Sequence, residues 1–339
     1  MAVRMKDIAQ DLGVSLATVS KVLNNHTDIS PATKARVLRR MKELDYKPSL
    51  HAQGLVSGRS FMVGFIVPDL VYAFFAEIAK SLSRVLRSQG YGLLISSSDE
   101  DPEIEKQEIE QMLRRQVDVL ILASCQLDGA SLLKVAENKV PYILVDRKFS
   151  HHRSHFVGTD DVLIGELATK HLIKVGHRRI AHIGGQKVST SLGRLQGYRK
   201  ALATHRIRVP ADYVILRDKG DESGDITGYQ AMQTLLRLKP RPDAVFCYND
   251  SAAVGAMNAI LDAGLRIPED IAVVGAGNLR YSDSLRVALT SVDVPSKALG
   301  EHAGKLALQL IDSKAQLLPK SVLVEPKLVI RQSTVLKGI

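Results

Sequence analysis

Residues 5–23 read MKDIAQDLGVSLATVSKVL, and the spacing of their apolar, glycine and serine residues predicts local structure. Ile8 and Leu12 recur at helical spacing. Gly13 can end that helix, because glycine adopts a left-handed turn without steric cost. Ser15 then stands at the N-cap position of a second helix, where its hydroxyl can accept a backbone hydrogen bond. The stretch therefore predicts two short helices joined by a tight turn.

A third helix is expected directly afterwards. Ser30 and Pro31 have the pattern of an N-cap followed by a proline in the first turn. Val37, Met41 and Leu44 then fall on one helical face. Three short helices of this kind form a helix-turn-helix arrangement, in which the second helix enters the major groove of DNA. The alternative is any small amphipathic three-helix bundle.

Side chains off the buried face of the second helix are candidates for DNA contacts. Leu16 and Ala17 can touch thymine methyl groups, and Lys21 can donate to guanine O6 and N7. The short polar side chains suit phosphates or base edges. The predicted DNA-binding residues of this region are Ser15, Leu16, Ala17, Thr18, Ser20, Lys21 and Asn24.

Positive charge is concentrated in the same region. The first 59 residues carry ten Lys and Arg against five Asp and Glu, and the whole 339-residue chain has a net charge of +10. A small basic module on a nearly balanced body suggests a polyanionic partner, although a solvated surface gives the same count.

Composition fits a globular protein of two or three domains, with 45% hydrophobic and 24% charged residues. No apolar run approaches the roughly 18 residues of a membrane helix. The N-terminus lacks the apolar stretch of a secretory signal, so a cytoplasmic location without membrane contact is expected. Cys125 and Cys247 match no metal-ligand spacing and are expected to be buried thiols, so neither a metal nor a cofactor is predicted.

Beyond residue 60, apolar strand-like segments alternate with helix-like segments. Continuous rather than alternating apolarity predicts strands covered on both faces, and hence parallel sheets. The pattern restarts after Thr159, which predicts two doubly wound α/β lobes. Strands are expected at 61–67, 91–97, 117–123, 140–146, 180–184, 244–248 and 271–275, and helices at 73–89, 103–115, 193–204 and 251–264, with further helices between 123 and 140 and up to 176.

Several motifs resemble the lactose/galactose-repressor (LacI/GalR) family of transcription regulators. In the N-terminal region they are Lys6-Asp7-Ile8-Ala9, Gly13-Val14-Ser15, Thr18-Val19-Ser20-Lys21-Val22-Leu23-Asn24 and Leu44-Asp45-Tyr46-Lys47-Pro48. Further along they include Ala73-Phe74-Phe75-Ala76-Glu77-Ile78, Val145-Asp146-Arg147, Asn249-Asp250 and Leu289-Thr290-Ser291-Val292. The resemblance covers essentially residues 5–335.

The resemblance implies an all-α helix-turn-helix headpiece and an α/β core like a periplasmic sugar-binding protein. The implied parts are the headpiece (1–48), a hinge helix (49–58) and an effector-binding and dimerisation core (59–339). By family topology the core has an N-lobe (60–158 plus 293–321) and a C-lobe (159–292 plus 322–339), with crossovers near 159, 292 and 322. No heptad tail follows, so a homodimer without a tetramerising extension is expected.

In that family the hinge folds on operator DNA and pushes a leucine between base steps of the minor groove. Leu55 holds that position here, which implies a kinked operator. Gly54 departs from the usual better helix former. A glycine inside a helix costs about 0.5–1 kcal/mol, which suits a segment that is disordered without DNA.

Ligand contacts in such folds come from loops at the carboxyl ends of strands. Aromatic faces combined with fork-like hydrogen-bonding groups suit a polar ring. The alternatives are a helix N-cap for Asp250, an interlobe salt bridge for Arg194, and core or dimer packing for Phe74 and Phe75. The predicted effector-binding residues are Phe74, Phe75, Asp146, Arg147, Thr190, Arg194, Asn249, Asp250 and Asn278.

The nature of the ligand leaves two possibilities open. Sugar-binding relatives usually bring an acidic residue into the cleft after the strand that ends here at Gly275, but this chain has Ala276-Gly277-Asn278. Without that carboxylate, Arg147 and Arg194 would make a sugar acid or sugar phosphate less costly to bind. The alternative is a neutral sugar, with Asn278 replacing the lost hydrogen bonds.

Other function classes fit less well. The run from Gly275 to Arg280 begins like a dinucleotide-binding loop but lacks its final glycine, and no phosphate-binding loop motif or paired nucleophile is present. A free solute-binding protein would carry a signal sequence and no headpiece. A sugar-processing enzyme fused to a DNA-binding domain is a further alternative, which a search for reaction products would test. The expected protein is a ligand-controlled operator-binding regulator, favoured as a repressor, and not an enzyme.

Overall fold

The computed structural model describes residues 3–23, 27–46, 54, 58–149, 153–217, 224–313, 315 and 317–335. Contacts divide the chain into two units, Met1–Ser60 and Phe61–Ile339. Most of the predicted hinge, including Leu55, lies outside the described residues. Within the described ranges, no helix has both the length and the apolar character of a membrane span.

The first unit contains α1 (Met5–Leu12), α2 (Leu16–Leu23) and α3 (Pro31–Glu43). Gly13 ends α1 in the left-handed conformation, with φ of 63°. Ser30 caps α3 by accepting a hydrogen bond from the Thr33 amide. The helices pack on a small core of Ile8, Ala9, Val19, Val22, Val37 and Met41. These features confirm the predicted helix-turn-helix fold.

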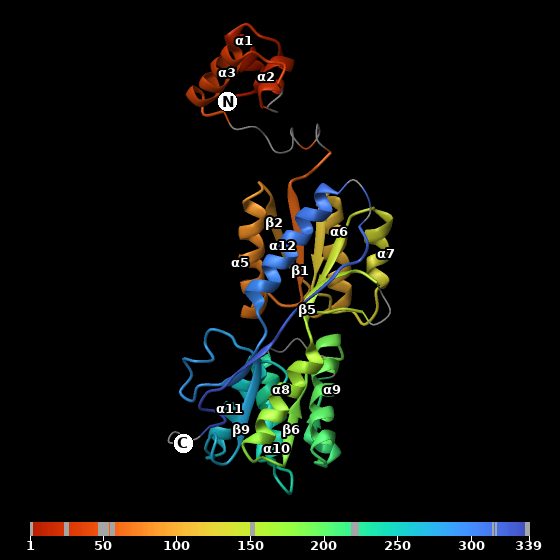
Figure 1. The fold of residues 1–339 in the computed structure, drawn as a ribbon, viewed down its shortest axis with the longest axis vertical. Helices are drawn as coiled ribbons and strands as arrows, with labels where there is room; N and C mark the ends of the chain where they lie inside the picture. The colour runs from red at the N-terminus through yellow and green to blue at the C-terminus, as the bar shows by residue number, and fades with distance from the viewer. Residues whose placement is uncertain are drawn as a thin grey trace. The chain divides into compact units, whose positions relative to one another are not determined.

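The second unit contains two six-stranded sheets (Figure 1). The N-lobe sheet has the order β11-β5-β4-β3-β1-β2 and is parallel throughout. Its strands are β1 (Met62–Val67), β2 (Gly92–Ser97), β3 (Val119–Leu122), β4 (Tyr142–Val145), β5 (His155–Thr159) and β11 (Ser321–Val324). Its helices are α5 (Ala73–Arg87), α6 (Pro102–Arg114), α7 (Ala130–Glu137) and α12 (Ser296–Asp312).

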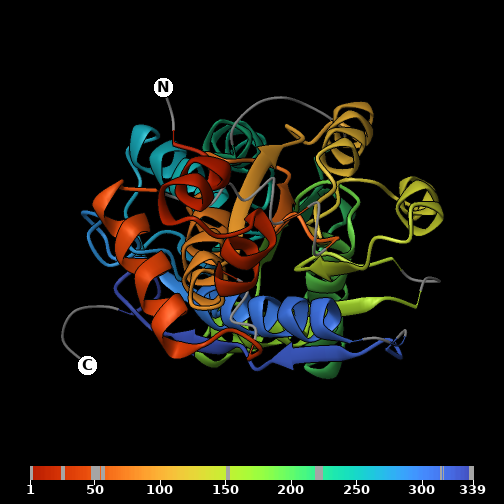
Figure 2. The ribbon, with the colours of Figure 1, turned by 90° about the horizontal axis from the view of Figure 1, so that it is seen from above.

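Apolar side chains on both faces of this sheet are buried. Phe65 and Ile121 pack in one cluster with α5 and α12, whereas Ile66 and Leu120 pack in another with α6 and α7. Seen from above, α6 and α7 lie on the other side of the sheet from α12 (Figure 2). Coverage of both faces explains the continuous apolar runs in the sequence.

The C-lobe sheet has the order β12-β10-β9-β8-β6-β7, and only its edge strand β12 is antiparallel. Its strands are β6 (Ile180–Ile183), β7 (Val214–Ile215), β8 (Ala244–Cys247), β9 (Ala272–Gly277), β10 (Thr290–Asp293) and β12 (Lys327–Val329). Its helices are α8 (Asp161–Lys174), α9 (Ser189–Thr204), α10 (Gly224–Leu236), α11 (Asp250–Asp262) and the short η1 (Ala211–Tyr213). Two doubly wound lobes are therefore present, which confirms the predicted fold class.

Three segments join the lobes. They follow Thr159, Asp293 and Val324, where the chain leaves one sheet for the other. The third crossing was expected near 322 and lies slightly later, because β11 stays paired with β5 as far as Val324. The three segments bring the carboxyl ends of the strands of both sheets to the cleft between the lobes.

Candidate functional site

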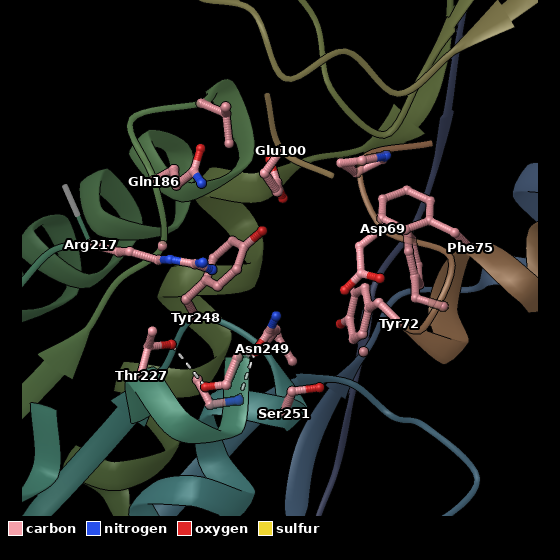
Figure 3. A pocket seen from close by; sticks show the side chains of 18 of the residues that line it. Asp69, Tyr72, Phe75, Glu100, Gln186, Arg217, Thr227, Tyr248, Asn249 and Ser251 are labelled. Atoms are coloured by element: carbon pink, nitrogen blue, oxygen red, sulfur yellow. Dashed lines mark hydrogen bonds between the residues drawn. The ribbon is translucent and has the colours of Figure 1, made fainter. Parts of the chain in front are cut away.

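A cavity of about 320 Å³ lies between the two lobes. This volume is in the range of small-molecule sites, which is roughly 300–1,000 Å³. Loops at the carboxyl ends of strands in both lobes form its walls (Figure 3). The lining residues are Pro68, Asp69, Val71, Tyr72, Phe74, Phe75, Asp99, Glu100, Asp146, Arg147, Gly184, Gly185, Gln186, Val188, Arg194, Arg217, Gly224, Asp225, Thr227, Tyr248, Asn249, Ser251, Ala252, Ala276, Gly277 and Val294.

Six of the nine residues predicted to bind an effector line this cavity. They are Phe74, Phe75, Asp146, Arg147, Arg194 and Asn249. Thr190, Asp250 and Asn278 do not line it.

Aromatic side chains form the N-lobe wall. Tyr72 packs against Phe74 and Phe75 with ring centroids 5.9 and 5.8 Å apart, and Phe74 meets Phe75 edge to face at 5.2 Å. Tyr72 and Phe75 face Tyr248 and Asn249 across the cavity (Figure 3). Phe74 and Phe75 also belong to the buried N-lobe core. Phe74 and Phe75 therefore both pack in the core and line the cavity.

Arg147 is paired with a carboxylate of its own wall. Its two terminal nitrogens donate to Glu100 at 2.8 and 2.7 Å, and its side chain is only 5% exposed. Burial disfavours the charged form of Glu100, but the Arg147 guanidinium holds the pKa of that carboxyl below its usual range. The charge of the Arg147 guanidinium is thus neutralised by Glu100 within the N-lobe.

Arg194 is held by two groups of the C-lobe. Its Nε donates to Asp161 Oδ1 at 3.0 Å, and its Nη1 donates to the Tyr248 carbonyl oxygen at 2.7 Å. The guanidinium also lies 5.0 Å from the centroid of the Tyr248 ring. All three residues belong to the C-lobe, so this ion pair does not bridge the lobes. It fixes the planar guanidinium at the cavity wall.

Asp250 is fully buried, and its oxygens are used inside the C-lobe. It accepts hydrogen bonds from the Leu279 amide at 2.8 Å, Ser282 Oγ at 2.9 Å and Ser291 Oγ at 2.6 Å. The N-cap of α11 is its neighbour Asn249, which accepts from the Ala252 amide. Asp250 therefore fastens the segment after β9 to β10, and is neither the helix cap nor a cavity-lining residue.

Asn278 also points away from the cavity. Its backbone is left-handed, with φ of 49°, and its side chain lies between Asp293 at 3.3 Å and Arg331 at 2.7 Å. Gly277 lines the cavity instead. Thr190, in the first turn of α9, is only 1% exposed, and the adjacent Ser191 accepts a hydrogen bond from the Gly185 amide.

Sequence reasoning missed several polar lining residues. Most follow strands, as Asp69 follows β1, Glu100 follows β2 and Tyr248 follows β8, so the rule on carboxyl ends would have included them. Arg217 follows β7, a two-residue strand that gave no pattern in the sequence. The remaining missed polar residues are Tyr72, Asp99, Gln186, Asp225, Thr227 and Ser251.

The buried Asp161 predicts a specific pH dependence of stability. Burial raises the pKa of its carboxyl to about 6 against the influence of Arg194. Between these two pKa values the native state therefore holds a proton that the unfolded chain, with a pKa of about 3.9, has already released. The stabilisation by this group is present below the unfolded pKa and is lost as the pH rises through the folded pKa of about 6. Relative to wild type, Asp161→Asn should gain about 2 kcal/mol between pH 4 and pH 7 in urea unfolding.

The unpaired Arg194 of that variant adds only a constant offset, because arginine stays charged throughout. A difference between the two proteins that does not change with pH would show that Asp161 titrates normally.

The exposed side of α2 carries the predicted DNA contacts. Leu16 is 50% exposed, and Ala17 and Lys21 are also exposed. Ser15 accepts a hydrogen bond from the Thr18 amide at 3.0 Å and bonds to the Thr18 hydroxyl, so both serve the start of α2.

Six of the eight predicted DNA-binding residues are among those that the structure describes. Ser20 is half-buried, and Lys21 forms an ion pair with Asp28. Asn24 and Leu55 lie outside the described residues.

A helix-turn-helix unit joined to a two-lobed unit with a ligand-sized cavity defines a class of protein, the ligand-responsive DNA-binding regulator. Residues 60–332 match the family described as periplasmic binding proteins and sugar binding domain of LacI family. Residues 4–49 match the bacterial regulatory proteins of the lacI family. The chain belongs to the LacI family of bacterial regulatory proteins.

Relatives that match nearly the whole chain are regulators of transcription. The HTH-type transcriptional repressor PurR of Yersinia pestis bv. Antiqua is 35% identical over 337 residues, covering 97% of this chain and 96% of that protein. The lac repressor dimer bound to operator and the anti-inducer ONPF is 27% identical, with a TM-score of 0.85 over 99% of this chain and 100% of that one. The regulator CelR in complex with cellobiose is 29% identical, with a TM-score of 0.73 over 98% and 99%.

These relatives are transcriptional regulators, which confirms that the chain is a DNA-binding transcriptional regulator with an effector-binding domain and not an enzyme.

Proposed function

We propose that this protein is a cytoplasmic homodimeric repressor whose affinity for operator DNA is set by a neutral hydroxylated molecule, a sugar or close derivative, held between the lobes. The observation that carries the proposal is the cavity itself. It combines aromatic walls with hydrogen-bonding groups from both lobes. A ligand held by both lobes can have different affinities for different arrangements of the lobes, and that difference is what shifts a regulator between states.

The charges of the cavity favour a neutral ligand over an anionic one. Five carboxylates line it against three guanidinium groups, namely Asp69, Asp99, Glu100, Asp146 and Asp225 against Arg147, Arg194 and Arg217. Arg147 already binds Glu100, and Arg194 already binds Asp161. To bind Arg147 or Arg194, a sugar acid or sugar phosphate would have to displace one of these carboxylates. The lack of an acidic residue at position 278 does not change this balance, because Asn278 does not line the cavity.

The geometry of DNA recognition supports the proposed dimer. Two helix-turn-helix units related by a two-fold axis match a pseudo-palindromic operator. The related lac repressor was solved as a dimer on its operator. Leu55 as the wedge in the minor groove rests on the sequence resemblance.

A thermal-shift screen tests the ligand class. The panel contains glucose, ribose, galactose and cellobiose, the acid gluconate, glucose 6-phosphate and free nucleobases. A ligand at 100 times its dissociation constant adds about 2.7 kcal/mol to the free energy of unfolding. We expect a neutral sugar to raise the melting temperature most. Stabilisation by the acid or phosphate alone, lost on adding salt, would overturn the neutral-ligand proposal.

Lys21→Ala tests the DNA-binding face. If Lys21 donates to a guanine, the variant should lose about 1–3 kcal/mol of binding free energy at one symmetric base position of the operator. The measurement is fluorescence anisotropy with duplexes that carry each base pair at each position. Equal weakening on every sequence would show that Lys21 contacts only phosphate.

A further inference from the structure

Asp28 places a carboxylate on the DNA-facing side of the headpiece. The Lys21 ammonium contacts its Oδ2 directly, and the two side chains are 46% and 54% exposed. Lys21 follows the exposed Ala17 by one helical turn, on the side of α2 expected to face DNA. The Lys21–Asp28 pair therefore lies at the surface and not in the small core.

Stability does not account for this pair. Exposed ion pairs contribute little to folding, and this one joins two half-exposed side chains. The Arg40–Asp11 pair is similarly exposed, at 35% and 42%, but it joins two helices, α3 and α1, whereas the Lys21–Asp28 pair joins α2 only to the turn before α3. A carboxylate beside a recognition lysine is also unfavourable near phosphates, unless the groove supplies a hydrogen-bond donor to it.

The major groove offers such a donor in a fixed place. Guanine presents O6 and N7 as acceptors, and cytosine presents its N4 amino group as a donor. In a G·C pair, guanine O6 accepts a hydrogen bond from the cytosine N4 amino group, so an acceptor and a donor lie side by side at the edge of the major groove. An ammonium in contact with a carboxylate presents the complementary donor and acceptor, also side by side.

We propose that Lys21 and Asp28 together recognise one G·C base pair in each half-site, with Lys21 donating to guanine and Asp28 accepting from cytosine N4. The inference rests on the proposed function, in which Lys21 contacts a base. It makes Asp28 a specificity-determining residue. A C·G pair would put the cytosine N4 donor against the ammonium and the guanine O6 acceptor against the carboxylate, and an A·T pair would put the adenine N6 donor and the thymine O4 acceptor in the same places. A T·A pair keeps the right order, but replaces guanine N7 by a thymine methyl group.

The test compares wild type, Lys21→Ala, Asp28→Ala and the double variant on duplexes with every base pair at every operator position. The operator is first selected from random duplexes with the full-length protein. We expect both single variants to lose about tenfold in discrimination of G·C against C·G at the same position. The double variant should lose little more, because each single change already breaks the shared contact.

An altered base supplies the decisive arm. Replacing the paired cytosine by 2-pyrimidinone, which lacks the N4 amino group, should weaken wild-type binding about tenfold and leave Asp28→Ala unaffected. Glu43→Ala is the charge-matched control, since it removes a headpiece carboxylate that pairs with Arg39 and Arg40 on α3.

If Asp28→Ala only strengthens binding to all sequences alike, as Glu43→Ala is expected to do, the carboxylate merely reduces net charge and the inference fails. Selection of no sequence by the wild type would instead overturn the proposed function.

Discussion

Arg194→Ala is expected to abolish binding of the neutral sugar found in the thermal-shift screen, with a loss of at least about 100-fold, or about 2.7 kcal/mol. Arg194 lines the cavity, yet it is only 5% exposed and is fixed by Asp161 and the Tyr248 carbonyl oxygen. The planar group is thus oriented before the ligand arrives, so little entropy is lost on binding. Titration calorimetry measures the loss directly.

Two further variants separate binding from folding. Arg199→Ala removes an exposed arginine from the same helix, α9, and should leave sugar binding unchanged. Arg194→Lys keeps the charge but not the fork, and should also lose most binding because lysine cannot bond Asp161 and the Tyr248 carbonyl in the same geometry. Unchanged sugar affinity in a folded Arg194→Ala protein would remove Arg194 from the site.

Gly255→Ala should destabilise the two-lobed unit by about 3 kcal/mol, the upper end of the usual cost of overpacking. Gly255 lies where α11 crosses α10, and a Cβ there would be 1.8 Å from the Asp225 carbonyl oxygen and 2.7 Å from the Tyr229 amide nitrogen. These contacts are with backbone, so the helices must move apart. Since Asp225 lines the cavity, sugar affinity should fall together with stability.

Asn258→Ala is the matched control on the same helix, because Asn258 is exposed. It should change the free energy of unfolding by no more than about 0.5 kcal/mol. If Gly255→Ala were equally harmless in urea unfolding, the close approach of α10 and α11 would not be needed.

The sequence predicted the fold class because its strongest signals are local. Gly13, Ser15 and Ser30 act within a few residues of chain, so the ends of the headpiece helices could be placed. Most strands in the middle of each sheet are covered on both faces and therefore appear as apolar runs. Two edge strands gave no such signal, since β11 alternates between exposed and half-buried residues and β7 has only two residues.

The cavity was harder to predict than the fold. A position after a strand places a residue near the cavity, but its partners decide where the side chain points. Asp250 turns inward to two serines and an amide, and Asn278 turns to Asp293 and Arg331. These partners are distant in the sequence, so neither orientation could be inferred. The pairing of Arg147 with Glu100 was missed for the same reason, and with it the charge balance of the cavity.

The central claim is that ligand and operator binding are coupled, and reciprocity tests it most directly. The affinity for the selected operator duplex is measured by anisotropy without and with a saturating amount of the sugar found in the screen. The affinity for that sugar is then measured by calorimetry without and with the duplex. The account predicts that both affinities change by the same factor, typically about 5- to 150-fold. A sugar that binds the cavity and leaves operator affinity unchanged would contradict the account.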